Sequence, residues 1–153
     1  MKNKGQAAME FLMTYGWAIL VVLIAIGALS YFGVLSPEKF LPEKCVISSG
    51  SGLFCDEFTS SSSADTVTIR LKNILTESTW VDSVSMDAPS CSFSTADTKI
   101  SADNTTDFSL GCSGGLNKGD KIKGTLTITY DVGSTAGEGL SKTTTGQIVT
   151  VVP

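Results

Sequence analysis

The chain changes its pattern of hydrophobic and polar positions once, near residue 36. Residues 4–34 read KGQAAMEFLMTYGWAILVVLIAIGALSYFGV, and no charged residue lies between Phe11 and Leu35. A helix over these positions would span roughly 38 Å at about 1.5 Å per residue, and the hydrocarbon core of a bilayer is about 30 Å thick. The segment is apolar around its whole circumference, so lipid or other protein must cover it. We therefore predict a long hydrophobic helix over residues 6–35.

Beyond residue 36 the hydrophobic positions alternate with polar ones, which is typical of half-buried strands. In residues 66–74, for example, Val67, Ile69 and Leu71 share one face and the residues between them are polar. Similar strand candidates are residues 80–86, 90–94, 98–101, 106–112, 122–132 and 143–152. Six to eight short strands at this spacing predict a β-sandwich, and with the helix they give an α+β fold.

Some positions in this region carry more specific expectations. Gly124 is expected to mark a β-bulge and Gly146 to interrupt the last strand. Trp80 is expected in the core, with an exposed sugar-binding aromatic as the alternative. Residues 45–55 are expected to form a loop stapled by its cysteines, and residues 59–63 a polar turn.

A short linker is expected between the helix and the strands. Residues 36–44 read SPEKFLPEK, with two prolines and alternating charge. Proline ends helices and favours an extended chain, so this stretch predicts a fairly stiff connection. The β-sandwich domain is then expected to occupy residues 45–153.

Composition excludes several classes of function. The formal net charge is −4, histidine is absent and Arg70 is the only arginine. No cluster of basic residues could neutralise a row of phosphates, so nucleic-acid binding is not expected. Without histidine the chain lacks the commonest general base and the commonest zinc ligand. We see no nucleophile–base grouping and no phosphate-binding glycine loop, and we predict a protein that is not an enzyme and needs no cofactor.

The four cysteines predict two disulfides formed in an oxidising compartment. They are Cys45, Cys55, Cys91 and Cys112, all beyond the apolar segment. Their spacing does not match the close pairs of zinc or redox motifs, so no metal site is expected there. Three connectivities are possible. The local one, Cys45–Cys55 with Cys91–Cys112, is favoured only because each pair brackets its own short segment.

The apolar segment begins with an acid, Glu10, that ordinary membrane signals do not explain. A secretory signal peptide has a shorter apolar core than this one, although Ala28-Leu29-Ser30 is a fair cleavage site. A simple signal anchor fits the length, and its flanking lysines, Lys2 and Lys4, would stay cytoplasmic. Neither account gives Glu10 a specific role. The alternative is that its carboxylate simply reaches the lipid headgroups at the membrane surface.

The stretch Lys4-Gly5-Gln6-Ala7-Ala8-Met9-Glu10 resembles the class III signal peptide of archaeal type IV pilins, of the euryarchaeal adhesion-pilin type. In that family a prepilin-type peptidase cuts after the glycine and the apolar helix is retained. The resemblance implies a leader over residues 1–5, cleavage between Gly5 and Gln6, and Glu10 at the fifth mature position. It also implies an immunoglobulin-like sandwich as the head.

The resemblance further implies a function and partners. The chain would insert in the membrane as a precursor, and an assembly ATPase and a membrane platform protein would polymerise it into an adhesive surface filament. A buried carboxylate costs several kcal/mol unless it is paired, so Glu10 would need a partner in a helix bundle. The α-amino group exposed by cleavage is the nearest candidate, and such a pair would fix the register between subunits.

Two alternatives and one modification remain open at this point. The same leader could anchor an extracellular binding module or a minor pilin that forms no long filaments. Asn104-Thr105-Thr106 is the only Asn-x-Ser/Thr sequon, so Asn104 is a candidate glycosylation site. The surrounding residues 103–107 are acidic but lack the spacing of a calcium-binding loop.

Overall fold

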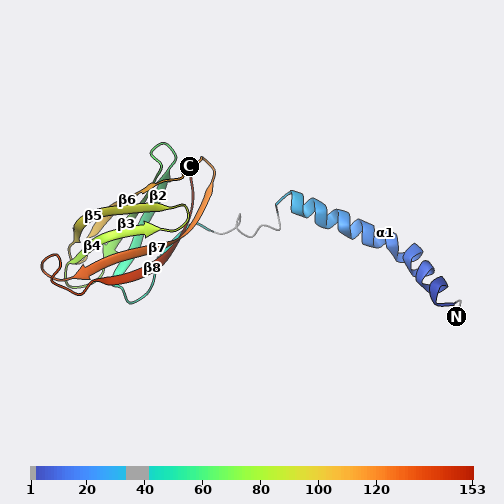
Figure 1. The fold of residues 1–153 in the computed structure, drawn as a ribbon, viewed down its shortest axis with the longest axis horizontal. Coiled ribbons are helices and arrows are strands. Elements are labelled where there is room, and N and C mark those ends of the chain that lie inside the picture. Colours follow the sequence, from blue (N-terminus) through green and yellow to red (C-terminus); the bar gives the residue numbers. More distant parts are fainter. Residues whose placement is uncertain (1–2, 34–41) are drawn as a thin grey trace. The chain divides into compact units, whose positions relative to one another are not determined.

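The structure is a computed structural model that describes residues 3–33 and 42–153. The chain divides into two units, residues 1–41 and 42–153, which are described separately (Figure 1). The first contains one helix and the second contains only strands, which confirms the α+β class. Most of the predicted linker, residues 36–41, lies outside the described residues, and the first strand begins at Lys44.

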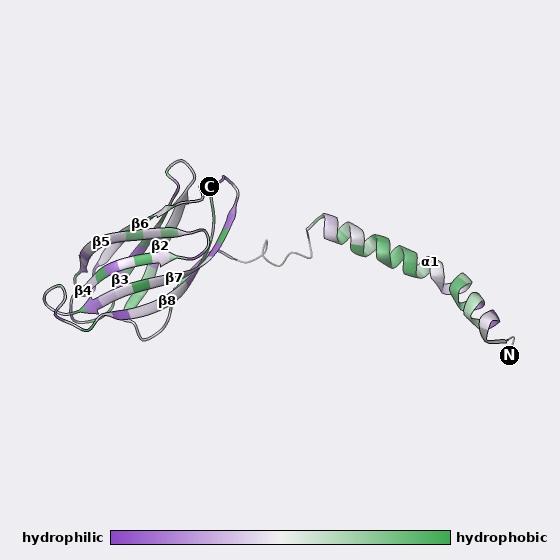
Figure 2. Cartoon of the chain, viewed as in Figure 1, coloured by the Kyte–Doolittle hydropathy of each residue, from purple (hydrophilic) through white to green (hydrophobic). Residues whose placement is uncertain are grey.

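Helix α1 spans Asn3–Tyr31 and is apolar along most of its length (Figure 2). Its residues Gly5–Tyr31 are long and apolar enough to cross a membrane. The helix ends in a glycine cap: Gly33 has φ 69°, and its N–H donates to the carbonyl of Ser30 at 3.1 Å. Glycine adopts this left-handed conformation without a steric penalty, which explains why the helix ends here.

The second unit, which we call the head, is a single antiparallel sheet of eight strands. The strands are β1 Lys44–Ile47, β2 Leu53–Ser61, β3 Thr66–Asn73, β4 Thr79–Met86, β5 Cys91–Ile100, β6 Thr105–Cys112, β7 Lys121–Val132 and β8 Lys142–Val151. Their order is β1-β8-β7-β4-β5-β6-β3-β2. The two outermost strands, β1 and β2, contact each other, so the sheet curls round to enclose a core.

The core is built from the inward positions of nearly every strand, as the alternation predicts. Val67, Ile69 and Leu71 of β3 are fully buried, and so are Phe108 and Leu110 of β6. Strand β7 contributes Ile122, Leu126, Ile128 and Tyr130.

Two disulfides join strands where the curled sheet has few or no backbone pairs. The pairing is the local one of the three possibilities: Cys45 with Cys55, and Cys91 with Cys112. The first links β1 to β2, where the curled sheet closes. The second links β5 to β6, which share only two residue pairs, Cys91↔Cys112 and Ser92↔Gly111. Each disulfide therefore holds two weakly paired strands together.

The structure corrects the loop expected at the start of the head. Residues 45–55 contain β1 and the start of β2 around a short turn, and residues 59–61 belong to β2. The segment expected as two short strands at 90–101 is the single strand β5. These strands were missed because β1 is short and β2 has a register shift between Cys55 and Glu57 that breaks its alternation.

Both glycine expectations were wrong. Strand β7 runs through Gly124 without a register shift, and β8 runs through Gly146 in the same way. A Cβ atom at Gly124 would lie 2.5 Å from the carbonyl oxygen of Ala88, and one at Gly146 would lie 2.6 Å from that of Val46. These glycines are required by close approach of neighbouring backbone, not by a bulge.

Trp80 lies on the outer face of the sheet, not in the core. Its indole Nε1–H donates to the carbonyl of Gly133 at 3.1 Å, and the Lys99 Nζ lies 5.3 Å from the ring centroid. A register shift between Val81 and Ser83 moves the inward parity by one residue, so Val81 is buried and Trp80 is half-buried. The Lys99 side chain over the ring and the hydrogen bond at its edge argue against the open stacking surface of a sugar site.

Candidate processing and assembly segment

Gly5 and Gln6, the residues of the expected cleavage site, lie near the N-terminal end of α1 and are exposed. Glycine in a helix interior is about 1 kcal/mol less favourable than alanine. A Cβ atom at Gly5 would meet nothing within 4 Å, and Gly5 is not among the glycines with positive φ. Neither packing within the chain nor backbone conformation therefore requires glycine at this position.

Glu10 lies one helical turn beyond Gln6, and its side chain is exposed. In a helix, residues four apart lie on the same face, so a new α-amino group on Gln6 would lie on the face of the Glu10 carboxylate. The backbone carbonyl of Glu10 accepts a hydrogen bond from the Thr14 hydroxyl at 2.8 Å. That bond satisfies the Thr14 hydroxyl within the helix. Glu10 is the only acidic residue of α1.

Within residues 3–33, the apolar surface of α1 is not covered. In the most apolar stretch of Gly5–Tyr31, none of the residues is buried. Large side chains are exposed on every side, for example Met13 at 82 %, Trp17 at 69 % and Leu23 at 64 %. Soluble proteins rarely leave contiguous apolar patches of this kind uncovered, so the surface marks contact with lipid or with other protein.

Four small residues in the middle of α1 lie on two opposite faces. Ala18 and Ala25 are seven residues apart and share one face, whereas Gly16 and Gly27 are eleven apart and share the opposite face. No contact within the chain requires either glycine. Small side chains let helices approach closely, so α1 can pack closely against neighbours on two sides.

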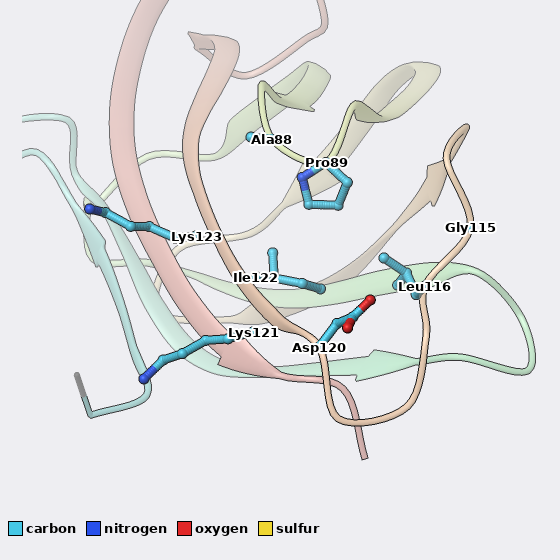
Figure 3. Close-up of a pocket in the computed structure, with 8 residues that line it drawn as sticks. All are labelled: Ala88, Pro89, Gly115, Leu116, Asp120, Lys121, Ile122 and Lys123. Carbon is cyan, nitrogen blue, oxygen red and sulfur yellow. The ribbon is translucent and has the colours of Figure 1, made fainter. Parts of the chain in front are cut away.

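The head has several shallow hollows. One, of about 300 Å³, lies between the β4–β5 turn and the start of β7 (Figure 3). Pro89, Leu116 and Ile122 face it, and Lys121 and Lys123 extend to the side (Figure 3). The residues that line this hollow include no nucleophile beside a base.

A charged network lies on the exposed face of β2, β3 and β6. Arg70 donates to Asp107 through Nε and Nη2 at 2.6 and 2.9 Å, and to Glu57 through Nη1 at 2.6 Å. The hydrogen bond and charge of Asp107 raise the pKa of Arg70, and in turn the pKa of Asp107 lies below its usual value. The side chains are 39–68 % exposed, so water and salt screen the network. We assign it a structural role.

Asn104, the candidate glycosylation site, is exposed in the turn just before β6. Its backbone is held by two hydrogen bonds, from its own N–H to the carbonyl of Ser101 and from the N–H of Asn73 to its carbonyl. The neighbouring Asp103 pairs with Lys72 at 3.0 Å. The sequon is therefore accessible on an ordered turn.

Comparison with known proteins adds no identification. The chain matches no protein-family model, and no curated protein sequence matches it significantly. The functional conclusion must therefore come from the chain's own features.

Proposed function

We propose that this protein is the structural subunit of an archaeal type IV-like surface filament, most simply an adhesive pilus. The observation that carries the proposal is the N-terminal segment. The first two turns of a 27-residue apolar helical segment, Gly5–Tyr31, contain Gly5, Gln6 and Glu10. The apolar helix and the two disulfides suit a membrane-anchored precursor whose head lies outside the cell.

The helix suits a filament core because its apolar surface is not covered by the other described residues of its own unit, residues 3–33. Lipid is already apolar, so moving the helix from membrane to a helix bundle gains little hydrophobic free energy. Specificity must then come from close packing and from polar pairing. Small residues on two faces of α1 permit close packing with two neighbours, and Glu10 offers one polar pairing per subunit.

In the proposed assembly a prepilin-type peptidase cuts between Gly5 and Gln6, and an assembly ATPase and a platform protein draw the mature subunit out of the membrane. Moving the helix out of lipid changes the hydrophobic free energy little per unit of surface area. An external energy source such as ATP hydrolysis therefore suits the process. The head would then form the filament surface, where its disulfides and the Asn104 sequon face the outside of the cell.

The cleavage step is tested by Gly5→Val in the native cell. We expect the variant to keep residues 1–5, because the peptidase would no longer find glycine before the cut, and intact-mass measurement shows this directly. Ala8→Val is the matched control, since it adds the same β-branched side chain at another exposed position of α1 and should still be trimmed. Trimming of Gly5→Val at Gln6 would contradict the proposal.

The assembly step is tested by Glu10→Ala with Glu10→Gln beside it. Both variants should be inserted and trimmed but should yield no filaments in the sheared surface fraction. Glutamine keeps the size and removes the charge, so failure of both variants assigns the role to the charge. Normal filament yield from Glu10→Ala would refute this part of the proposal. Trimmed wild-type protein that stays in the membrane would favour an anchored binding module instead.

A further inference from the structure

Strand β6 has one edge that pairs with no other described strand over most of its length. Residues 105–111 pair with β3 on one side without interruption. On the other side β6 meets β5 at only two positions, Cys91↔Cys112 and Ser92↔Gly111. From Leu110 back to its first residue, β6 is therefore an edge strand, although it lies in the interior of the strand order.

The hydrogen bonds at the two ends of β6 show which backbone groups point to this free edge. The Asn73 N–H donates to the carbonyl of Asn104 at 3.0 Å, and the Cys112 N–H donates to the carbonyl of Asp65 at 2.8 Å. In an antiparallel pair, alternate residues of a strand bond to the same neighbour. The even-numbered residues of 104–112 therefore bond to β3, and residues 105, 107 and 109 direct their N–H and C=O groups to the free edge.

The other edges of the head are protected in ways that the edge of β6 is not. Proteins blunt exposed strand edges with short strands, bulges, proline and lysine. Strand β1 has only four residues, β2 has a register shift between Cys55 and Glu57, and residues 95–97 of β5 stand opposite Asp82 alone. Strand β6 pairs with β3 without a shift and contains neither proline nor lysine. Its edge is therefore regular enough to accept another strand.

The one charged residue of β6, Asp107, does not guard the edge by repulsion. Arg70 donates to its carboxylate through Nε and Nη2 at 2.6 and 2.9 Å, so the negative charge is paired on the outer face of the sheet. The neighbours of Asp107 along the free edge, Thr105 and Ser109, have short uncharged side chains. A second strand can therefore approach the backbone of β6 closely.

We propose that the free edge of β6 pairs with the same edge of a second copy of this chain. An antiparallel pair centred on Asp107 places Thr105 opposite Ser109 of the second copy, so that all three residues exchange N–H···O bonds. A register moved towards Gly111 would need backbone groups that already pair with Ser92. Because the edges of β1, β2 and β5 are short or irregular, β6 is the matching edge that the chain itself supplies.

The proposed pair is isologous, since both copies contribute the same residues. Its hydrogen bonds replace bonds to water, so one pair of free heads associates weakly. Two heads that their α1 helices hold in one membrane have a high effective concentration, which favours the pair. The contact would add a backbone-mediated junction between heads to whatever contacts the helices make.

Cross-linking in phosphatidylcholine vesicles tests the pair on the full-length protein. All four native cysteines are in disulfides, so Asp107→Cys introduces the only free thiol. Opposed residues in a hydrogen-bonded pair lie about 5.5 Å apart at Cα, which suits a disulfide. We expect dimers on a non-reducing gel after mild oxidation. Asp56→Cys, exposed on β2, is the matched control and should stay monomeric. Equal dimer from both variants, or none from Asp107→Cys, would overturn the proposal.

Hydrogen exchange of the wild type tests the same contact without a substitution. At a high ratio of protein to lipid, the amides of Asp107 and Ser109 should exchange slowly, and dilution with lipid should make them fast. The amides of Thr106 and Phe108, which bond to β3, should stay protected at both ratios. Fast exchange of Asp107 and Ser109 at every ratio would contradict the pair. Both experiments use the unassembled chain, so they stand or fall separately from the filament proposal.

Discussion

Replacing Gly124 by alanine should destabilise the head, because the site has no room for a methyl group. A Cβ atom there would lie 2.5 Å from the carbonyl oxygen of Ala88, and 2.6 and 2.9 Å from Cγ and Sδ of Met86. The methionine is flexible and can move aside. The carbonyl belongs to the backbone of the β4–β5 turn, so β7 and this turn must separate.

The size of the effect follows from two opposing contributions. Overpacking of this kind costs about 1–3 kcal/mol, and replacing glycine by alanine in a strand returns about 0.5–1 kcal/mol of conformational entropy. We expect a net loss of about 1–2 kcal/mol of unfolding free energy. For a domain near 100 residues this corresponds to a fall in Tm of roughly 5–15 °C.

The assay is thermal or denaturant unfolding of the full chain in detergent, followed by near-UV circular dichroism. Gly111→Ala is the matched control: it also lies in a strand, and a Cβ atom there meets nothing within 4 Å. That variant should be neutral or slightly stabilised. If the two variants lose the same stability, the close approach of β7 to the β4–β5 turn is not what requires glycine at position 124.

Two further changes probe the closure and the charge of the head. Replacing Cys91 and Cys112 together by alanine removes a disulfide that closes a loop with a sequence separation of 21. The free energy of unfolding, measured by urea denaturation, should fall by about 3 kcal/mol. An unchanged midpoint of unfolding would show that this disulfide does not stabilise the head. In the folded head, mainly through burial, the pKa of Asp82 is raised above its usual value of 3.8. The charged carboxylate therefore lowers the free energy of unfolding at neutral pH, and this loss of stability disappears as the pH falls to 3.8. Asp82→Asn should therefore be more stable than the wild type at neutral pH, with a difference that shrinks in acid; a difference independent of pH would refute this.

The sequence predicted those elements whose hydrophobic pattern is long and regular. The helix is of this kind because its apolar run is unbroken, and strands β3 and β7 are of this kind because their inward positions keep a single period. Strand β2 does not keep a single period. The register shift after Cys55 changes its inward parity, and a polar residue, Ser60, is then buried, where its hydroxyl donates to the carbonyl of Val151.

The error at Trp80 has the same physical origin. Counting back from Val84 by twos places Trp80 inward, but the shift between Val81 and Ser83 reverses the faces. A bulge of this kind is set by pairing with neighbouring strands, so no local pattern reveals it.

The candidate processing segment, by contrast, is local and could be read directly from consecutive residues. The structure adds that no contact with another described residue requires glycine at Gly5, and that Glu10 lies exposed one turn beyond Gln6.

The central claim, that this chain is trimmed and built into a surface filament, is tested most directly at its N-terminus. The measurement is the intact mass and first residue of the protein from sheared surface material and from the cell envelope. A chain that starts at Gln6, or its cyclised form, in the sheared fraction is the expected result. A chain that starts at Met1 and is confined to membranes would contradict the account, and so would a secreted chain that starts near Tyr31.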